Sequence, residues 1–221
     1  MELYIEKIIE KMKEELSCSA HSIDHVMRVY NLCNLISKYE ENVNMDILKP
    51  AALLHDIARS IESNDVSGEI DHAVLGSEMA SDFLKEIGYP QELIEDIKHC
   101  IIVHRFRSGN EPKTIEAKIL FDADKLDAIG SVGIARSFML AGQFGQSIIS
   151  QSSDEYVNSN IVENGRIKDV SKHSPFMEYE FKFKKIPSKL FTQKAIEIGK
   201  KRLGYMENYF TRLSKEIDGE L

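Results

Sequence analysis

The sequence of 221 residues contains no tryptophan, only three cysteines and only five prolines. Cys18, Cys33 and Cys100 cannot all pair within one chain, and none lies in a Cys-x-x-Cys motif, so they are expected to be reduced, partly buried thiols. No apolar run approaches the roughly 18 residues of a membrane span. The N-terminal segment also lacks the basic, apolar and small-residue regions of a signal peptide. These absences predict a cytoplasmic protein without membrane contact.

Positive charge is scarce as well. The chain has 28 Lys and Arg against 36 Asp and Glu, which gives a formal net charge of −8. Long-range electrostatics therefore repel a polyanion and argue against broad nucleic-acid binding. A small phosphorylated ligand stays compatible with this charge if a metal and a few local bases supply positive charge. With 43% hydrophobic residues, the chain can bury a substantial core.

Apolar residues recur at spacings of three and four along most of the chain, with charged residues between them. This period predicts amphipathic α-helices. The predicted helices span residues 3–16, 21–39, 46–57, 71–87, 90–104, 115–141 and 188–217. The third is apolar enough to be central, with Pro50 in or near its first turn. Thr114 and Ser188 are expected to cap the last two helices.

Two segments break this period. Residues 59–70 are rich in Ser, Asn, Asp and Gly, which predicts a polar loop, and 142–187 is expected to be irregular, with short helical turns or strands. No β-alternation precedes residue 140. The predicted fold is therefore an all-α helical bundle, one domain over 1–221 with its motif core at about 20–141. The apolar face of the last helix fits either a homo-oligomer contact or packing onto the bundle.

Histidines and aspartates stand within the apolar helices. His25, the pair His55-Asp56 and an aspartate in the segment 121–127 come from separate helices, and such groups can converge on one divalent ion in a bundle core. The His55-Asp56 pair has apolar neighbours on both sides, so a buried acid there needs a partner. A metal ion is one such partner, and a hydrogen-bonded ion pair is another.

Three stretches of the chain resemble the HD-domain metal-dependent phosphohydrolase superfamily. They are His21–Val29, Ala51–Ile57 and Lys118–Gly130. The last of them is similar to a subgroup of small bacterial and archaeal predicted HD hydrolases. The resemblance implies an HD-domain helical bundle and a set of metal ligands, namely His25, His55, Asp56 and Asp124. Asp124 is preferred over Asp122 because the family's last ligand commonly lies in an Ala-Asp-Lys-Leu context.

The resemblance also offers a second metal. Some HD proteins bind two ions through additional histidines, and His72 and His104 lie between the His-Asp pair and the last aspartate, where those members place such ligands. Alternatively, both histidines bind the phosphate of the substrate or a water molecule. Mixed His/Asp ligation suits Mn, Mg, Fe, Co or Ni.

Hydrolysis in such a site would use water activated by the metal, and nearby cations would stabilise charge on the phosphoryl oxygens. Arg28 and Lys125 are the preferred catalytic cations because they lie in the family-like stretches, and Arg59 is a candidate for substrate binding. Asp127 is a candidate catalytic residue, sharing a helix face with Asp124. The choice of general acid among Asp127, Glu62 and Asp65 stays open.

The implied function is metal-dependent hydrolysis of a small phosphorylated substrate, in particular a nucleotide. Some members of the similar subgroup are thought to cleave nucleoside triphosphates to a monophosphate and pyrophosphate. Two alternatives come from other classes: a di-iron oxygenase, as among HD proteins with six His/Asp ligands, and a nucleotide-binding sensor without catalysis. The intact ligand positions argue against the sensor.

Overall fold

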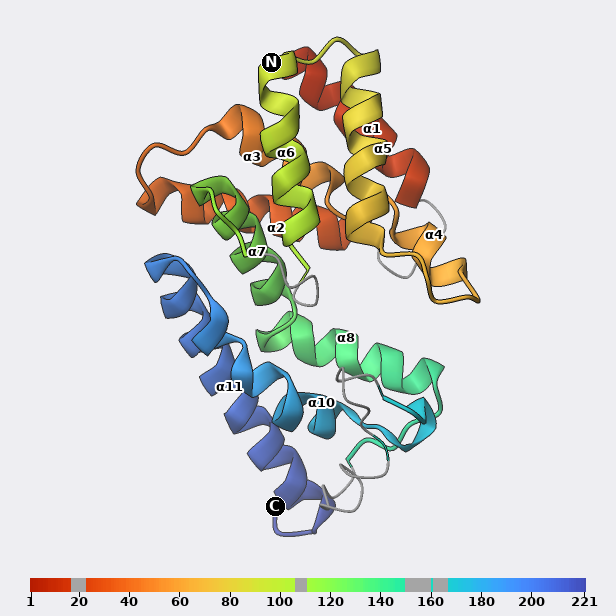
Figure 1. Cartoon of the computed structure of the whole chain (residues 1–221). Helices are drawn as coiled ribbons and strands as arrows, with labels where there is room; N and C mark the ends of the chain where they lie inside the picture. Colours follow the sequence, from red (N-terminus) through yellow and green to blue (C-terminus); the bar gives the residue numbers. More distant parts are fainter. Residues whose placement is uncertain (17–22, 106–110, 150–159, 161–166) are drawn as a thin grey trace. The chain divides into compact units, whose positions relative to one another are not determined.

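The computed structural model describes residues 1–16, 23–105, 111–149, 160 and 167–221. Every regular element among these residues is a helix (Figure 1), which confirms the predicted all-α fold. None of the described helices is long and apolar enough to cross a lipid bilayer. Two of the predicted free thiols, Cys33 and Cys100, are buried and unpaired, and Cys18 lies outside the described residues.

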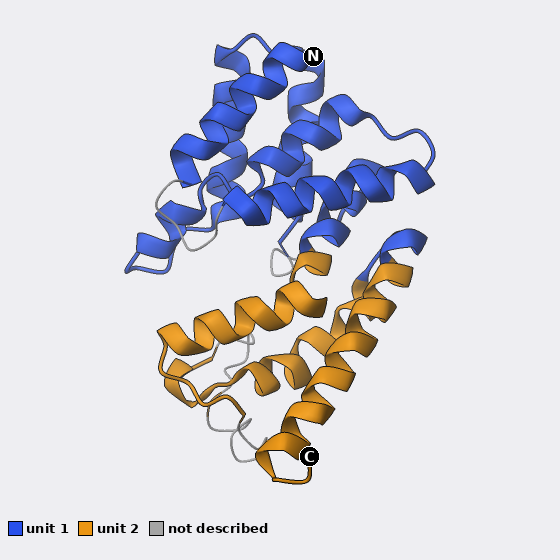
Figure 2. Ribbon diagram, turned by 180° about the vertical axis from the view of Figure 1, so that it is seen from behind, with its two compact units in different colours: residues 1–124, 190–195 blue, residues 125–189, 196–221 orange. Residues whose placement is uncertain are grey.

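The chain divides into two compact units (Figure 2). Unit 1 comprises residues 1–124 and 190–195, and unit 2 comprises 125–189 and 196–221. That the whole chain forms a single domain stays a prediction.

Unit 1 is built around α3. The helices of this unit are α1 (Glu2–Leu16), α2 (Ile23–Ile36), the 3₁₀ helix η1 (Ser37–Tyr39), α3 (Met45–Leu54), α4 (Arg59–Asn64), α5 (His72–Glu86), α6 (Gln91–Val103) and most of α7 (Ile115–Asp127). As predicted, α3 is central: it is apolar on nearly all sides and packs against α1, α2 and α6. The α5 and α6 helices run side by side (Figure 1).

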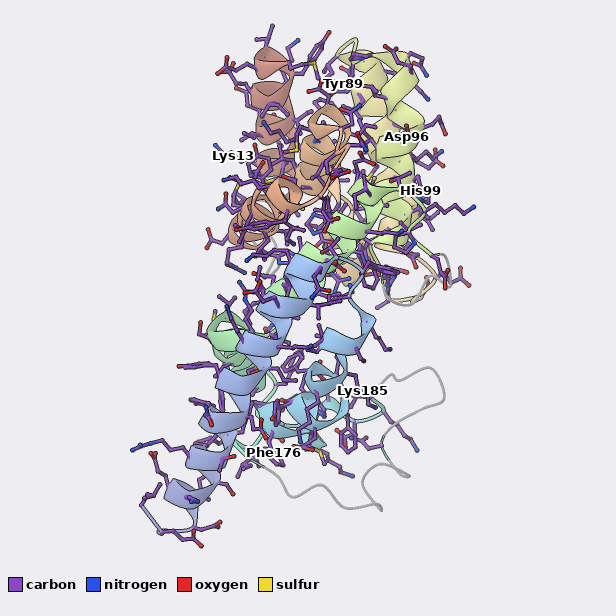
Figure 3. All side chains as sticks on the ribbon, turned by 90° about the vertical axis from the view of Figure 1, so that its left-hand side faces the viewer. Lys13, Tyr89, Asp96, His99, Phe176 and Lys185 are labelled. Carbon is purple, nitrogen blue, oxygen red and sulfur yellow. The ribbon has the colours of Figure 1, made fainter. Side chains whose placement is uncertain are left out.

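Pro50 lies in the interior of α3 and not near its first turn, which corrects the prediction. A proline lacks the N–H that would bond to the carbonyl four residues earlier, here that of Asp46. The hydroxyl of Tyr89, labelled in Figure 3, donates to this Asp46 carbonyl at 2.6 Å. A side chain from the segment before α6 therefore satisfies the acceptor that the proline leaves open.

The predicted helix over 115–141 is two helices, α7 and α8 (Gly130–Gln143). Gly130 has a φ of +83°, a conformation that other residues rarely adopt. A Cβ on Gly133 would lie 2.2 Å from the Ala128 carbonyl oxygen. These glycines therefore mark the break between the two helices.

Two further boundaries differ from the predictions. The polar loop at 59–70 contains the short helix α4, and the last helix, α11 (Gln193–Ile217), begins after Thr192 and not after Ser188. The hydroxyl of Ser188 donates to the Lys185 carbonyl instead. Thr192 supplies the cap, since its hydroxyl oxygen accepts from the amide of Ala195.

Asp122 fixes the segment that leads into α11. Its buried carboxylate accepts the Phe191 amide at 2.9 Å, the Thr192 amide at 2.7 Å and the Thr192 hydroxyl at 2.7 Å. Amides at the start of a helix lack intrahelical acceptors, so a carboxylate from another helix serves them well. Burial nevertheless raises the pKa of Asp122 to about 6. Asp122 therefore serves the start of α11, and the choice of Asp124 as the fourth ligand stays a prediction.

Unit 2 has an aromatic core. Besides α8 and most of α11, its elements are η2 (Val170–Lys172), α10 (Pro175–Phe181), η3 (Phe183–Lys185) and η4 (Pro187–Lys189). Phe210 of α11 stacks on Tyr179 of α10 with ring centroids 4.7 Å apart and lies 5.9 Å from Phe176. The described parts of 142–187 thus have short helices, as predicted, and no strand; residues 150–159 and 161–166 lie outside the described residues.

Candidate metal centre

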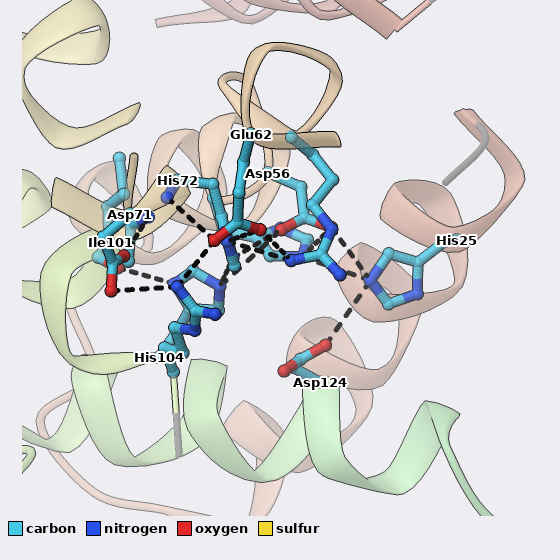
Figure 4. Close-up of polar contacts among 12 residues, drawn as sticks. His25, Asp56, Glu62, Asp71, His72, Ile101, His104 and Asp124 are labelled. Carbon is cyan, nitrogen blue, oxygen red and sulfur yellow. Dashed lines mark hydrogen bonds and ion pairs between the residues drawn. The ribbon is translucent and has the colours of Figure 1, made fainter. Parts of the chain in front are cut away.

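Five helices of unit 1 bring six candidate side chains together (Figure 4). They are His25 on the buried face of α2, His55 and Asp56 directly after α3, His72 at the start of α5, His104 directly after α6, and Asp124 in α7. The four histidines and Asp56 are at most 7% exposed. The prediction that separate helices would converge at this point agrees with the geometry.

Asp56 lies in the middle of the cluster. Its Oδ2 atom is 3.6 Å from His25 Nε2 and 3.8 Å from His55 Nε2. Its Oδ1 atom is 3.3 Å from His72 Nε2 and 3.7 Å from His104 Nε2. Each carboxylate oxygen therefore faces two imidazole nitrogens, and Asp56 joins two half-sites.

We call these the His25 half and the His72 half. The His25 half consists of His25, His55 and Asp124, and in it Asp124 Oδ1 lies 3.4 Å from His25 Nε2. The His72 half consists of His72 and His104. Together with Asp56, the histidines of each half place one ligand atom per residue within 4.8 Å of one another, close enough to hold a metal ion.

Backbone carbonyls orient two of the imidazoles. His55 Nδ1 lies 2.8 Å from the Ala52 carbonyl oxygen, and His104 Nδ1 lies 2.6 Å from that of Ile101. A carbonyl oxygen can only accept, so both Nδ1 atoms carry a proton. The Nε2 atom of such an imidazole presents a lone pair to the cluster when the ring is neutral. These carbonyls are free because they belong to the last turns of α3 and α6.

The Nε2 atoms of neighbouring imidazoles lie within hydrogen-bond distance of one another. His55 Nε2 is 3.3 Å from His25 Nε2, and His72 Nε2 is 3.3 Å from His104 Nε2. Burial lowers the pKa of His55 to about 4 and also lowers the pKa of His72. Burial alone would raise the pKa of Asp56, but the imidazoles of His55 and His104 hold it well below its usual value. Neutral imidazoles, such as those of His55 and His72, beside an ionised carboxylate are the donor set that a divalent transition metal takes.

A layer of charged residues surrounds the His72 half. The carboxylate of Glu62 in α4 lies 2.8 Å from His72 Nδ1 and accepts from Arg59 at 2.6 Å and from Arg105 at 2.7 Å. Arg105 also pairs with Asp71, the N-cap of α5, at 2.9 Å. The sequence singled out Glu62 only as one choice of general acid and did not indicate Arg105. For Asp71, its position directly before a helix was the available signal.

The remaining predicted residues have varied surroundings. Arg59 lies beside the His72 half, with one guanidinium nitrogen 2.9 Å from His72 Nδ1. Arg28 is half-buried on α2, one turn after His25. Lys125 and Asp127 belong to unit 2, where the carboxylate of Asp127 pairs with Arg136 at 2.8 Å. Catalytic roles for Arg28, Lys125 and Asp127 stay predictions.

Asp65, one of the three choices of general acid, organises its own loop. Its carboxylate accepts from the Ser67 hydroxyl at 2.7 Å and from the amides of Ser67 and Ile70 at 2.9 and 3.0 Å. These bonds lower its pKa to about 2, so it is ionised at neutral pH and cannot donate a proton there.

Comparison with known proteins identifies the family. A model of the HD domain matches residues 22–129, which include all six side chains of the cluster. The uncharacterized protein YpgQ of Bacillus subtilis (strain 168) is 30% identical over 205 residues, which cover 91% of this chain and 86% of YpgQ. The chain belongs to the HD-domain family.

Solved HD-domain structures share the whole fold. An HD-superfamily hydrolase from Bacillus thuringiensis aligns with a TM-score of 0.72 and 27% identity over 98% of both chains. The structure of Bacillus subtilis YpgQ in complex with ADP aligns with a TM-score of 0.72 and 26% identity, covering 97% of this chain and 98% of that one. The present chain thus has the fold of an HD-superfamily hydrolase and a His/Asp cluster that can hold a divalent metal.

Proposed function

We propose that this HD-domain protein is a cytoplasmic, metal-dependent phosphohydrolase whose substrate is a nucleotide, with nucleoside triphosphates as the first candidates. The observation that carries the proposal is the Asp56 carboxylate, which faces two imidazole nitrogens with each of its oxygens. The ADP bound to the related YpgQ supports a nucleotide as the ligand.

In this proposal, the two halves would hold two ions. His25, His55, Asp56 and Asp124 would hold one, and Asp56, His72 and His104 the other. When bound, the ions supply Lewis acidity for a phosphoryl oxygen and acidify a water molecule. Which divalent metal serves in the cell depends on availability as well as on ligand type.

The cations around the cluster would bind the phosphates. The guanidinium groups of Arg59 and Arg105 meet at Glu62, beside the His72 half, and a guanidinium is well shaped for two hydrogen bonds to phosphate oxygens. Arg28 and Lys125 would stabilise the charge that gathers on the phosphoryl oxygens. Asp127 would serve as a further catalytic residue for the same substrate. The formation of a homo-oligomer stays a prediction.

The test is a screen for released phosphate and pyrophosphate. Nucleoside mono-, di- and triphosphates would each be incubated with Mn²⁺, Mg²⁺, Co²⁺ or a chelator. We expect pyrophosphate from triphosphates, lost with the chelator and in Asp56→Ala. Asp82→Ala is the matched control because Asp82 is an exposed residue of α5, with 82% of its side chain accessible, and it should keep full activity. Activity that survives in Asp56→Ala would refute the proposal.

A di-iron oxygenase is a second candidate because four histidines and two aspartates in two halves also fit an iron pair. Iron content and an optical spectrum of the protein purified without added metal distinguish the two. Two tightly bound irons, an optical signature and silence in the phosphate screen would favour the oxygenase.

A further inference from the structure

The carboxylate of Glu62 meets three side-chain groups at the edge of the cluster and also accepts from the backbone amide of His72 at 3.5 Å. Its Oε2 atom lies 2.8 Å from His72 Nδ1 and 2.6 Å from Arg59 Nη1, and its Oε1 atom lies 2.7 Å from Arg105 Nη1 (Figure 4). Only 17% of this side chain is exposed. Glu62 is thus shared between an imidazole of the His72 half and two guanidinium groups.

We propose that Glu62 is the positioning residue of the His72 half: it holds the proton of His72 on Nδ1, so that the Nε2 lone pair faces Asp56. This inference rests on the proposed function, in which His72 is a ligand of the second ion. In this proposal Glu62 is not itself a ligand, and it acts on the second ion through His72 and through the two guanidinium groups that it neutralises.

Two hydrogen-bonding arrangements compete for His72. In one, Nδ1–H donates to Glu62, and Nε2 is free to bind a cation. In the other, Arg59 Nη1, which lies 2.9 Å from His72 Nδ1, donates to a lone pair on that atom. The imidazole proton then moves to Nε2, which lies 3.3 Å from both Asp56 Oδ1 and His104 Nε2, and there it blocks ligation. Glu62 selects the first arrangement by accepting from both His72 and Arg59.

Charge points the same way. Arg59 and Arg105 place two positive charges beside the His72 half, and Glu62 pairs with both at 2.6 and 2.7 Å. Removing the negative charge of Glu62 leaves these guanidinium groups less neutralised, and they repel a cation at the His72 half. The His25 half has its own carboxylate in Asp124, so the loss should be confined to one of the two ions.

The first experiment measures the tautomer of His72 and needs no metal. Long-range ¹H–¹⁵N spectra of the full chain in chelator report which imidazole nitrogen carries the proton. We expect the Nδ1–H form of His72 in the unsubstituted chain, the Nε2–H form in Glu62→Gln, and restoration of Nδ1–H in Glu62→Asp, which keeps two acceptor oxygens. His55 and His104 are internal controls because backbone carbonyls fix both as Nδ1–H.

The second experiment measures Mn²⁺ binding by calorimetry. We expect two equivalents in the unsubstituted chain, and about 10–100-fold weaker binding of one equivalent in Glu62→Gln with the other unchanged. Glu116→Gln is the matched control. Glu116 is also a buried glutamate of unit 1, but its carboxylate accepts from the Asn44 amide and takes no part in the cluster.

The outcomes separate the two proposals. If the unsubstituted chain binds fewer than two equivalents, the two-ion site is refuted, and the role of Glu62 falls with it. If two equivalents bind and Glu62→Gln binds both as tightly, only the role of Glu62 is overturned. A metal-free, unsubstituted chain with His72 in the Nε2–H form would overturn that role as well, even if no variant folds.

Discussion

The burial of His55 predicts that the metal-free protein loses stability as the pH falls. Burial lowers the pKa of this imidazole from its ordinary 6.5 to about 4. The unfolded chain therefore binds a proton below pH 6.5 that the folded chain rejects. Since the unfolded state holds more protons at this site, the contribution of His55 to the free energy of unfolding decreases as the pH drops below 6.5 and levels off near pH 4.

The magnitude follows from the two pKa values. One unit of pKa difference corresponds to about 1.4 kcal/mol, so the full effect of His55 is about 3 kcal/mol, of which about 2 kcal/mol is lost between pH 7.5 and pH 5. The side chain is 0% exposed, so solvent does not screen this effect. A loss of this size is a large part of the stability of an ordinary domain.

The assay is urea unfolding in chelator, followed by far-ultraviolet circular dichroism at pH 7.5, 6 and 5. His55→Gln is the comparison because glutamine does not titrate and its amide can donate to the Ala52 carbonyl, as His55 Nδ1 does. The variant should lose about 2 kcal/mol less than the unsubstituted chain over this range. Parallel curves, within about 0.5 kcal/mol, would refute the argument.

Other predictions concern the two units separately. Asp122→Ala should lower the free energy of unfolding by about 1–3 kcal/mol, because it leaves the buried amide and hydroxyl of Thr192 without their acceptor; unchanged urea unfolding would contradict this. Gly133→Ala should lower the melting temperature, since its Cβ would lie 2.2 Å from the Ala128 carbonyl oxygen, whereas Gly142→Ala in the same helix meets no atom within 4 Å and should stabilise by up to about 1 kcal/mol. Equal melting temperatures for these two variants would show that the break before α8 tolerates a side chain. Chelator should lower the melting temperature of the unsubstituted chain, because a metal ion that binds only the folded state stabilises that state. It should leave the melting temperature of Asp56→Ala unchanged, because this variant lacks the carboxylate shared by both halves of the site.

Local sequence was enough for most helices and failed where distant contacts intervene. The period of apolar residues predicted α1, α2, α5 and α6 closely, because it reflects which face each helix buries. This pattern placed Pro50 near a helix start, but Pro50 lies inside α3. The Tyr89 hydroxyl there donates to the Asp46 carbonyl, which the proline leaves without its usual donor. The same pattern chose Ser188 as a cap, whereas Asp122 and Thr192 define the start of α11. In each case the deciding partner is far away in the sequence.

The sequence by itself determined the helical class, the family resemblance and the identity of the six clustered residues, because apolar spacing and motif order are properties of the chain alone. Only the tertiary structure decided that Asp56 faces His25 and His55 with one oxygen and His72 and His104 with the other. It also decided that Glu62 lies against His72 and that Asp122 serves α11. Distances between side chains of different helices depend on how the helices pack, and no spacing along one helix encodes them.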